Sequence, residues 1–507
     1  MFTQTFYGSL LLTVAWILVI QWRRRGKLPL PPGPRHIPLY GSVFRRTEMY
    51  QADTFGRFSR ELKSDVVSLT EWGNCTVVLN TFGAVNSLLI RNSSHSATRP
   101  PTWRKFRDWG GLHTSIPHLE YGEGWKARRQ TFNHLVSAAQ LPEHEKVQLQ
   151  VAQSMLLAIL NEPEKAVFFF YEMMGGLILT LVYGISELPN GETHIGLAER
   201  ALGGILYTFT REFQVACIVN RISRILPLPE SLFPIKKTNR MYREDVESQT
   251  YVPFQETKRQ MMADNVSASF VTEMLSQDNV DADLEIIIRD AAGSLYSGAL
   301  IATGSLLFTF MMSMAWFPEV QSKAQKELDL LLGHGNLPTF SICHPSKIPY
   351  TWSLILEAMR WRPPVSLGLD HSSDVDEEYE GLRIPAGSSI IANLKTILFD
   401  PEVYKNPETF QPERFLKSNG EFDPDVFDPR QVIFGFGRRK CPGRDIAFTS
   451  LVISIVSTLA SFDIVLRDEH NASRMSRDAA IASFIAIDIP LKFPHDNVLL
   501  KPRSQET

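Results

Sequence analysis

Residues 434–443 read Phe434, Gly435, Phe436, Gly437, Arg438, Arg439, Lys440, Cys441, Pro442, Gly443. One cysteine stands within this stretch, and the glycines around it let the backbone pass close to a flat group. The three consecutive cations before the sulfur favour its thiolate form. The stretch therefore predicts a cysteine thiolate that binds a metal. The alternative is a buried structural cysteine after a Gly-rich turn, but apolar burial does not require cations beside the sulfur.

The spacing FxxGxRxCxG within this stretch fixes Phe434, Gly437, Arg439, Cys441 and Gly443. It resembles the cysteine loop of the cytochrome P450 family, in particular that of microsomal members and of members from fungal secondary metabolism. In that family the thiolate is the axial ligand of a haem iron. The resemblance implies that Cys441 is the metal ligand of haem b (iron protoporphyrin IX) and that the other four residues belong to the cofactor-binding loop.

The composition of the whole chain is that of a globular protein, because 44% of its 507 residues are hydrophobic and 21% are charged. The net charge of −3 gives no electrostatic footprint for a nucleic-acid partner. The four cysteines, Cys75, Cys217, Cys343 and Cys441, lie far apart without zinc-type spacing. We interpret them as reduced thiols in a domain that faces the cytosol.

The first 35 residues predict a membrane anchor followed by a spacer. Residues 2–22 carry no charge and are numerous enough to cross a bilayer as a helix, and cations follow at positions 23, 24, 25 and 27. A cleaved signal peptide would carry its cations before the apolar run, and the positive-inside rule places the rest of the chain in the cytosol. An amphipathic or buried N-terminal helix is the alternative. We therefore expect an anchor over residues 1–27, a stiff Pro-rich hinge over 28–35 and a single catalytic domain over 36–507.

The catalytic domain is predicted to be mainly α with a smaller β portion, an α+β fold of the cytochrome P450 type. A helix is expected at residues 53–63 and strands at 66–70 and 76–80. Residues 98–117 are too irregular for a regular element, and in the family this place caps the substrate pocket. The segment from 143 to 280 has a helical pattern that is interrupted by prolines at 163, 189, 227, 229, 234 and 253.

Three further residues are candidates for contacts with the cofactor. Trp125 and Arg129 stand four apart in a helical stretch, so they share one helix face. The pair resembles the helix in which the family's Trp and Arg bind a haem propionate; alone, it would be an ordinary amphipathic helix. His371 precedes a strand-like run at 381–392 and stands where the family often places a propionate donor, and a satisfied loop histidine is an equally good interpretation.

A charge network is implied beneath the cysteine loop. Glu357 and Arg360 are three residues apart and share a helix face, and Arg414 belongs to the later sequence Pro-Glu-Arg-Phe. By resemblance to the family, these three side chains form a buried network, in which the loss of one partner strands an unpaired charge. An exposed ion pair of little energetic value is the alternative.

A second long uncharged run covers residues 291–317. By hydropathy alone it would be another membrane span, but its many small and hydroxyl-bearing residues favour a helix buried in the domain core. The family has such a helix across the distal face of the haem.

Within this run the chain departs from the family. The family usually has an acid and an alcohol that deliver protons, and the matching residues here are Ile301 and Ala302. Neither side chain can relay a proton. Thr303 follows about a quarter-turn further round the helix, and its hydroxyl could serve only if the helix were unwound or rotated there. Otherwise a substrate hydroxyl or an ordered water must supply the protons, which predicts a substrate that is already oxygenated.

The resemblance implies a monooxygenase that oxidises a lipophilic small molecule, such as a terpenoid or polyketide, with O₂ and NADPH-derived electrons. No dinucleotide fingerprint is present, so electrons must come from a partner, which in the family is the NADPH-cytochrome P450 reductase of the endoplasmic reticulum membrane. A cluster of cations near the cysteine would attract an acidic partner. Its expected members are Lys126, Arg128, Arg438, Arg439 and Lys440.

Two other classes use the same cysteine loop. A haem-thiolate isomerase or dehydratase would need neither O₂ nor a reductase. A non-catalytic haem-binding membrane protein would show no spectral change with a substrate.

Overall fold

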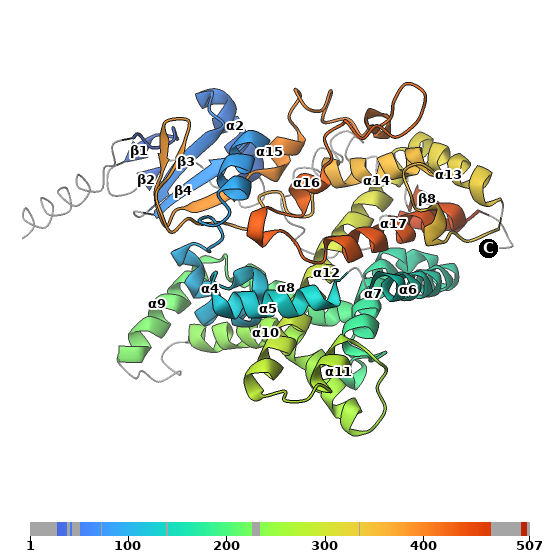
Figure 1. Ribbon diagram of the computed structural model, residues 1–507, viewed down its shortest axis with the longest axis horizontal. Coiled ribbons are helices and arrows are strands. Elements are labelled where there is room, and N and C mark those ends of the chain that lie inside the picture. The colour runs from blue at the N-terminus through green and yellow to red at the C-terminus, as the bar shows by residue number, and fades with distance from the viewer. Residues whose placement is uncertain are drawn as a thin grey trace, which may run out of the picture.

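The computed structural model describes residues 28–37, 41–42, 51–71, 74–137, 140–225, 234–333, 335–467 and 498–503. The anchor expected over residues 1–27 lies outside these ranges. Helices make up most of the described chain, and a small sheet lies at one end (Figure 1). The prediction of a mainly helical fold with a smaller β portion is therefore confirmed.

The helices follow one another in this order: α2 (Gln51–Leu62), α3 (Phe82–Val85), α4 (Arg104–Trp109), α5 (Glu123–Leu135), α6 (Leu141–Asn161), α7 (Ala166–Ile178), α8 (His194–Tyr207), α9 (Arg211–Ile225), α10 (Pro234–Met262), α11 (Phe270–Leu275), α12 (Ala282–Trp316), α13 (Pro318–Leu332), α14 (Pro349–Trp361), α15 (Leu394–Leu398), α16 (Arg430–Ile433) and α17 (Arg444–Ser461). Short 3-10 and π turns join several of them.

The main sheet has five strands in the order β1 (His36–Ile37), β2 (Gly41–Ser42), β3 (Val66–Glu71), β4 (Asn74–Leu79) and β7 (Ser389–Ala392). Its first four strands are antiparallel, whereas β7 joins β4 in parallel and so brings distant sequence to the N-terminal region. Two-stranded sheets pair β5 (Glu377–Tyr379) with β6 (Leu382–Ile384) and β8 (Phe462–Leu466) with β9 (Val498–Pro502). The strands predicted at 66–70 and 76–80 are β3 and β4.

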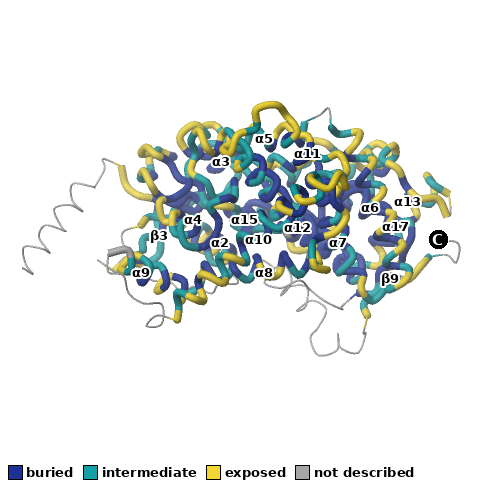
Figure 2. Tube along the Cα trace, turned by 90° about the horizontal axis from the view of Figure 1, so that it is seen from below, coloured by how far each residue is buried: buried dark blue, intermediate teal, exposed yellow. Residues whose placement is uncertain are grey.

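Helix α12 crosses the middle of the molecule, and Figure 2 shows buried residues concentrated around it. Among the described residues, three helical segments are long and apolar enough to cross a membrane by length and composition: Pro163–Tyr183, Ala282–Trp316 and Arg444–Ser461. In α12, 76% of the most apolar window is buried inside the fold. The run at 291–317 is therefore core, as its small and hydroxyl-bearing residues favoured.

Two predictions of irregular structure were wrong. The segment 98–117 contains a regular helix, α4, between short 3-10 turns. Pro253 lies inside α10 and does not break it, although proline removes one helical hydrogen bond. The hydroxyl of Thr257 donates to the carbonyl of Pro253 (3.0 Å) and to that of Tyr183 (3.0 Å), which ties this turn of α10 to its neighbour.

The Pro-rich segment is more than a spacer, because it is docked on the sheet. The carbonyl of Pro32 accepts from the Ser68 N–H (2.8 Å), and the carbonyl of Pro31 accepts from the Ser68 hydroxyl (2.6 Å). A Cβ at Gly33 would lie 2.0 Å from the Ser68 carbonyl oxygen, so only glycine permits this approach.

Candidate functional site

The cysteine loop turns sharply before α17. Gly435 and Gly437 have φ of +72° and +52°, a left-handed conformation that favours glycine. A Cβ at Gly437 would lie 2.4 Å from the Leu89 carbonyl oxygen, so the loop lies directly on the turn at 86–91. The Cys441 N–H donates to the Phe434 carbonyl (2.7 Å), which closes the loop on itself.

The sulfur of Cys441 stands in a mixed environment. Part of Cys441 is exposed to solvent. Protein atoms nevertheless surround the sulfur, and this desolvation raises the pKa of the thiol. The Gly443 N–H and the Arg129 guanidinium act in the opposite direction and favour the thiolate. Arg129 is thus the cation that the fold brings to the sulfur from outside the loop.

Helix α5 carries the Trp–Arg pair to the cysteine loop. The Arg129 guanidinium donates to the Lys440 carbonyl (2.6 Å), one residue before the cysteine. It also lies 5.9 Å from the centre of the Trp125 ring. Trp125 is buried, and its indole N–H has no partner among the described residues. An unpaired buried donor is costly, so this N–H marks a place for an acceptor.

The Arg439 side chain points inward from the cysteine loop. It donates to the carbonyls of Ala97 (2.6 Å) and Leu119 (2.8 Å), and it stacks over the Trp125 ring at 4.7 Å. Burial lowers the pKa of Arg439 to about 8, and the nearby cations Arg99 and Arg129 add to this effect. A neighbouring anion would stabilise the charged form of the Arg439 guanidinium.

Arg99 is a site residue that the sequence analysis missed. It donates to the Pro117 carbonyl (2.7 Å) and to the carbonyls of Leu369 and Asp370. Burial lowers its pKa to about 10, with the Asp370 carboxylate opposing this shift. A single arginine before a proline in an irregular loop has no periodic pattern, so no sequence signal pointed to it.

Two buried histidines lie beside these arginines. Nδ1 of His371 is 3.0 Å from the Ser96 carbonyl, which can only accept, so Nδ1 carries the proton. Burial lowers the pKa of His371 to about 3, and Arg99 adds to this shift. His118, which the sequence analysis also missed, is held by the Ser115 hydroxyl (2.9 Å), and burial lowers its pKa to about 3 as well. Both rings are neutral near pH 7.

These groups fit a flat dianion. Arg99 and Arg129 both act electrostatically on Arg439, and Arg129 acts on Cys441, so these guanidinium groups are neighbours beside the cysteine loop. Among the described residues, the carboxylate that acts on this set is that of Asp370, beside Arg99. The unpaired indole N–H of Trp125 adds a fourth donor. A haem presents two propionate carboxylates at one edge, so the donor set matches the cofactor that the resemblance implies.

Opposite the cysteine loop, one face of α12 is open. A Cβ at Gly443 would lie 3.4 Å from Cδ1 of Leu295, so Leu295 is on the side of α12 that faces this loop. Ala302 follows Leu295 by two turns, within about 20° of the same direction, and Gly298 lies between them. A Cβ at Gly298 would meet no atom within 4 Å. The open face therefore presents Gly298 and Ala302, and neither has a polar side chain.

Thr303 points elsewhere. It is 2% exposed and shares its face of α12 with Leu300 and Leu307, which are fully buried. The helix is unbroken from Ala282 to Trp316. The local unwinding that would bring the Thr303 hydroxyl to the open face is thus not present. For Ile301, the structure describes the helical backbone alone.

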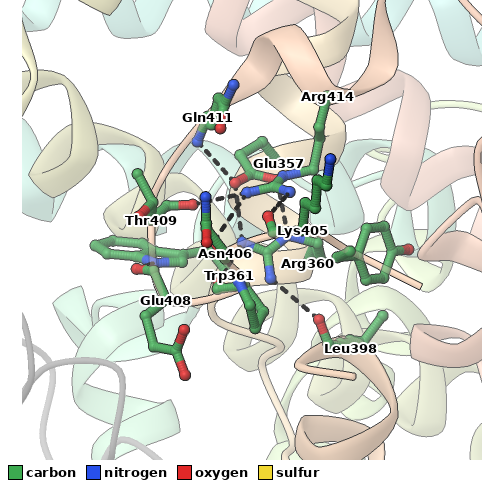
Figure 3. Close-up of polar contacts among 12 residues, drawn as sticks. Glu357, Arg360, Trp361, Leu398, Lys405, Asn406, Glu408, Thr409, Gln411 and Arg414 are labelled. Atoms are coloured by element: carbon green, nitrogen blue, oxygen red, sulfur yellow. Dashed lines mark hydrogen bonds and ion pairs between the residues drawn. The ribbon is translucent and has the colours of Figure 1, made fainter. Parts of the chain in front are cut away.

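The residues of the expected charge network lie together (Figure 3). Arg360 donates twice to the Glu357 carboxylate (2.8 and 2.9 Å), and Arg414 donates to the same group (3.0 Å). Glu357 and Arg360 are 0% exposed and Arg414 is 7% exposed, so this is not a surface pair. Arg360 also donates to the carbonyls of Leu398 (3.0 Å) and Pro407 (2.8 Å), which joins α14 to the segment before the cysteine loop.

The expected cluster of cations is smaller than predicted. Arg438 donates to the Tyr121 hydroxyl (2.6 Å), and the Lys126 ammonium lies 5.7 Å from the same ring, so these two cations are close together at the surface. Arg128 instead pairs with the buried Asp290 (2.8 Å). Arg439 is engaged with backbone carbonyls, as described above, and also leaves the surface. Sequence position alone does not show on which side of a helix or loop a cation lies.

Comparisons with known proteins place the chain among related sequences. The family model described as Cytochrome P450 matches residues 31–484. The chain is 33% identical to cytochrome P450 monooxygenase 208 of Postia placenta over 472 residues, which cover 91% of this chain and 89% of that protein. It is 29% identical to cytochrome P450 monooxygenase ple1 of Rhodocybe pseudopiperita, with 96% and 92% covered. It is 30% identical to cytochrome P450 monooxygenase claR of Ampulloclitocybe clavipes, with 86% and 80% covered.

Proposed function

The chain belongs to the cytochrome P450 family, and from that premise we propose that it is a membrane-anchored monooxygenase that oxidises a lipophilic small molecule. It is an oxidoreductase with haem as its cofactor. The overall reaction inserts one oxygen atom of O₂ into the substrate and reduces the other to water with two electrons and two protons. The bound haem supplies the redox chemistry of this step.

The residues around the cysteine loop hold the cofactor. Cys441 would bind the iron through its thiolate. Arg129, Arg439 and the Trp125 indole N–H would hold the propionates, and Arg99 would join them as a further donor. The single observation that carries this assignment is that three neighbouring guanidinium groups, of Arg99, Arg129 and Arg439, and the unpaired indole N–H of Trp125 lie beside the cysteine loop.

His371 has a secondary place in this arrangement. Its Nδ1–H is already used by the Ser96 carbonyl. Its other nitrogen can therefore donate to a propionate only when the ring is protonated, and burial opposes protonation. We propose that His371 holds the backbone at Ser96 close to β7, where His371 exchanges two backbone hydrogen bonds with Ile390 (2.8 and 2.7 Å). It is not a propionate donor near pH 7.

The test of the proposal is the spectrum of the reduced carbon monoxide complex. Thiolate ligation gives a red-shifted Soret band, and Cys441→Ser should abolish this band. Cys343→Ser is the matched control, because Cys343 is only partly buried and no cation stands beside it in the sequence. An unshifted band in the wild-type protein would contradict the assignment of Cys441.

The substrate class follows from the open face of α12. Gly298 and Ala302 offer no side chain that could hand protons to the reaction. We infer that a substrate hydroxyl or a water held by the substrate supplies them, which favours an already oxygenated terpenoid, polyketide or similar secondary metabolite.

The electron donor is proposed to be an NADPH-cytochrome P450 reductase. Lys126 and Arg438 stand together beside Tyr121 and offer a positive surface to an acidic partner. Arg438→Glu should raise the reductase concentration needed for half-maximal turnover and weaken the salt dependence of reduction. Arg57→Glu on α2, where the side chain is 59% exposed, is the control.

The chain is proposed to sit in the endoplasmic reticulum membrane with its catalytic domain in the cytosol. Residues 1–27 would be the anchor, 28–35 the hinge and 36–507 the catalytic domain. Cell fractionation of the full chain and of a variant with Leu11, Val14 and Leu18 all replaced by Asp tests the anchor. Equal membrane association of the two proteins would show that residues 1–27 are not the membrane anchor.

One observation favours a second candidate. A face of α12 without acid or alcohol also suits a haem-thiolate isomerase or dehydratase, which needs no proton delivery to oxygen. The two functions differ in whether turnover consumes O₂ and NADPH. A protein that binds haem without turnover would give no substrate-induced spectral shift in the same screen.

A further inference from the structure

We propose that Tyr171 is a positioning residue that fixes the rotation of α12, so that Ala302 and not Thr303 meets the space above the cysteine loop. This inference rests on the proposed function, in which that space is the reaction site. It concerns α7 and α12 and uses none of the residues assigned to the cofactor.

The Tyr171 ring lies directly on the backbone of α12. A Cβ at Gly304 would lie 2.1 Å from Cε1 and 2.4 Å from Cδ1 of Tyr171. No side chain other than the hydrogen of glycine fits there. Tyr171 is 2% exposed and belongs to the main core cluster, so its ring has little room to move away.

A second glycine forms an equivalent contact on the same side of α12. A Cβ at Gly293 would lie 2.6 Å from Oγ1 and 2.9 Å from Cα of Thr250 on α10. Gly293 and Gly304 are eleven residues apart, which is three turns with an offset of about 20°. Helices α7 and α10 therefore approach α12 closely along one line.

The reaction face is on the opposite side of the helix. Ala302 lies about 160° round α12 from Gly304, and Gly298 lies about 120° from it. The open space at Gly298 is thus on the far side from Tyr171. Thr303 is about 100° from Gly304 in the other direction, where Leu300 and Leu307 are fully buried.

Arg362 holds the following turn. Its guanidinium donates to the hydroxyls of Ser305 (3.3 Å) and Thr309 (3.2 Å), which stand one turn apart on α12. Together with the contact at Gly304, this interaction restrains the helix from two directions immediately after Thr303. A rotation of about 100° that brought Thr303 to the open face would break both contacts.

Cysteine reactivity tests this inference without turnover. Ala302→Cys and Thr303→Cys are each made in the full-length haem-loaded protein and treated with a small thiol reagent, and the labelled position is identified by peptide mass spectrometry. Labelling of a buried thiol requires a local opening. We expect Thr303→Cys to react at least about tenfold more slowly than Ala302→Cys.

The same ratio is then measured with Gly304→Ala added. The extra methyl group overlaps the Tyr171 ring, so α12 must rotate or shift, and the tenfold difference should fall towards unity. Gly176→Ala, also on α7, adds a methyl group where a Cβ would meet no atom within 4 Å, and it should leave the ratio unchanged. An unchanged ratio in Gly304→Ala, or a changed ratio in Gly176→Ala, would overturn the proposal.

If Gly304→Ala does not fold, Tyr171→Leu removes the ring that restrains α12 without adding any group to the helix, and the ratio is measured there. A ratio below that of the parent protein supports the inference, and the parent's ratio overturns it. Because labelling needs no substrate or electrons, a failure here is distinct from a failure of the proposed function, which the carbon monoxide spectrum reports.

Discussion

The two walls of the site differ in how closely they follow the family. The cysteine loop and the donors around it keep the family's residues at the family's spacing, and the structure brings them together. The facing turn of α12 has lost the acid and alcohol and presents Gly298 and Ala302. The cofactor side thus matches the family's pattern, whereas the facing turn of α12 departs from it, which is why we propose the substrate or its water as the proton source.

The largest expected effect tests the wall that is kept. Glu357→Ala leaves Arg360 and Arg414 buried without their shared carboxylate, which costs about 3–5 kcal/mol. We expect protein without haem, measured as the ratio of Soret to protein absorbance. Glu256→Ala is the matched control, because Glu256 and Arg259 are also three apart but Arg259 is 68% exposed. Equal haem content in the two variants would contradict a structural role for the network.

A smaller effect is expected for the donor that the sequence did not reveal. Arg99→Leu removes the proposed hydrogen bond to a propionate, together with the bonds to the carbonyls of Pro117, Leu369 and Asp370, and should speed haem loss by about tenfold. The rate is measured by transfer of haem to an excess of apomyoglobin. Arg104→Leu, with a side chain 76% exposed on the neighbouring helix α4, should leave the rate unchanged. No change in Arg99→Leu would restrict the propionate donors to α5 and the cysteine loop.

On the side of the site that contains the cysteine loop, His371 should make the stability of the fold depend on pH. The pKa of His371 is about 3 in the folded protein and about 6.5 in the unfolded chain. As the pH falls below 6.5, the unfolded chain therefore takes up a proton before the folded protein does. The free energy of unfolding decreases over this range and becomes constant below about pH 3. At pH 5 this loss amounts to about 2 kcal/mol. His371→Gln should therefore lose less stability than the wild type between pH 7 and pH 5 in thermal unfolding. His95→Gln, with a half-exposed ring, is the control.

The sequence predicted the residues that stand at fixed spacings within one element, and it did not predict those that only the tertiary fold brings to the site. The cysteine loop, the Trp–Arg pair and the Glu–Arg pair have fixed spacings within one element, and all three were found from the sequence. Arg99 and His118 come to the site only because the segment 98–118, with α4 and its short 3-10 turns, folds back on itself, and no periodicity encodes that path. The side on which Arg128 lies depends on Asp290 of α12, more than 160 residues away, so its departure from the surface cluster could not be foreseen.

The smallest expected effect tests the wall that has changed. Ala302→Thr places a hydroxyl on the open face of α12, where Gly298 and Ala302 carry none. If the substrate or its water now supplies the protons, the added hydroxyl competes with that arrangement. The fraction of NADPH recovered as product should then change by about twofold, with substrate affinity little altered. Product, peroxide and NADPH are measured together.

Thr303→Ala is the matched comparison, because Thr303 is buried on another face of the same turn. It should leave the coupling unchanged. If Thr303→Ala uncouples severely while Ala302→Thr has no effect, then Thr303 is the working hydroxyl and α12 turns by about 100° during catalysis. In that case the contact of Tyr171 with Gly304 must open in each cycle, and Gly304→Ala would be expected to raise turnover by favouring the rotated helix. If coupling instead follows Ala302, the helix stays in the position seen here and the proton source lies with the substrate.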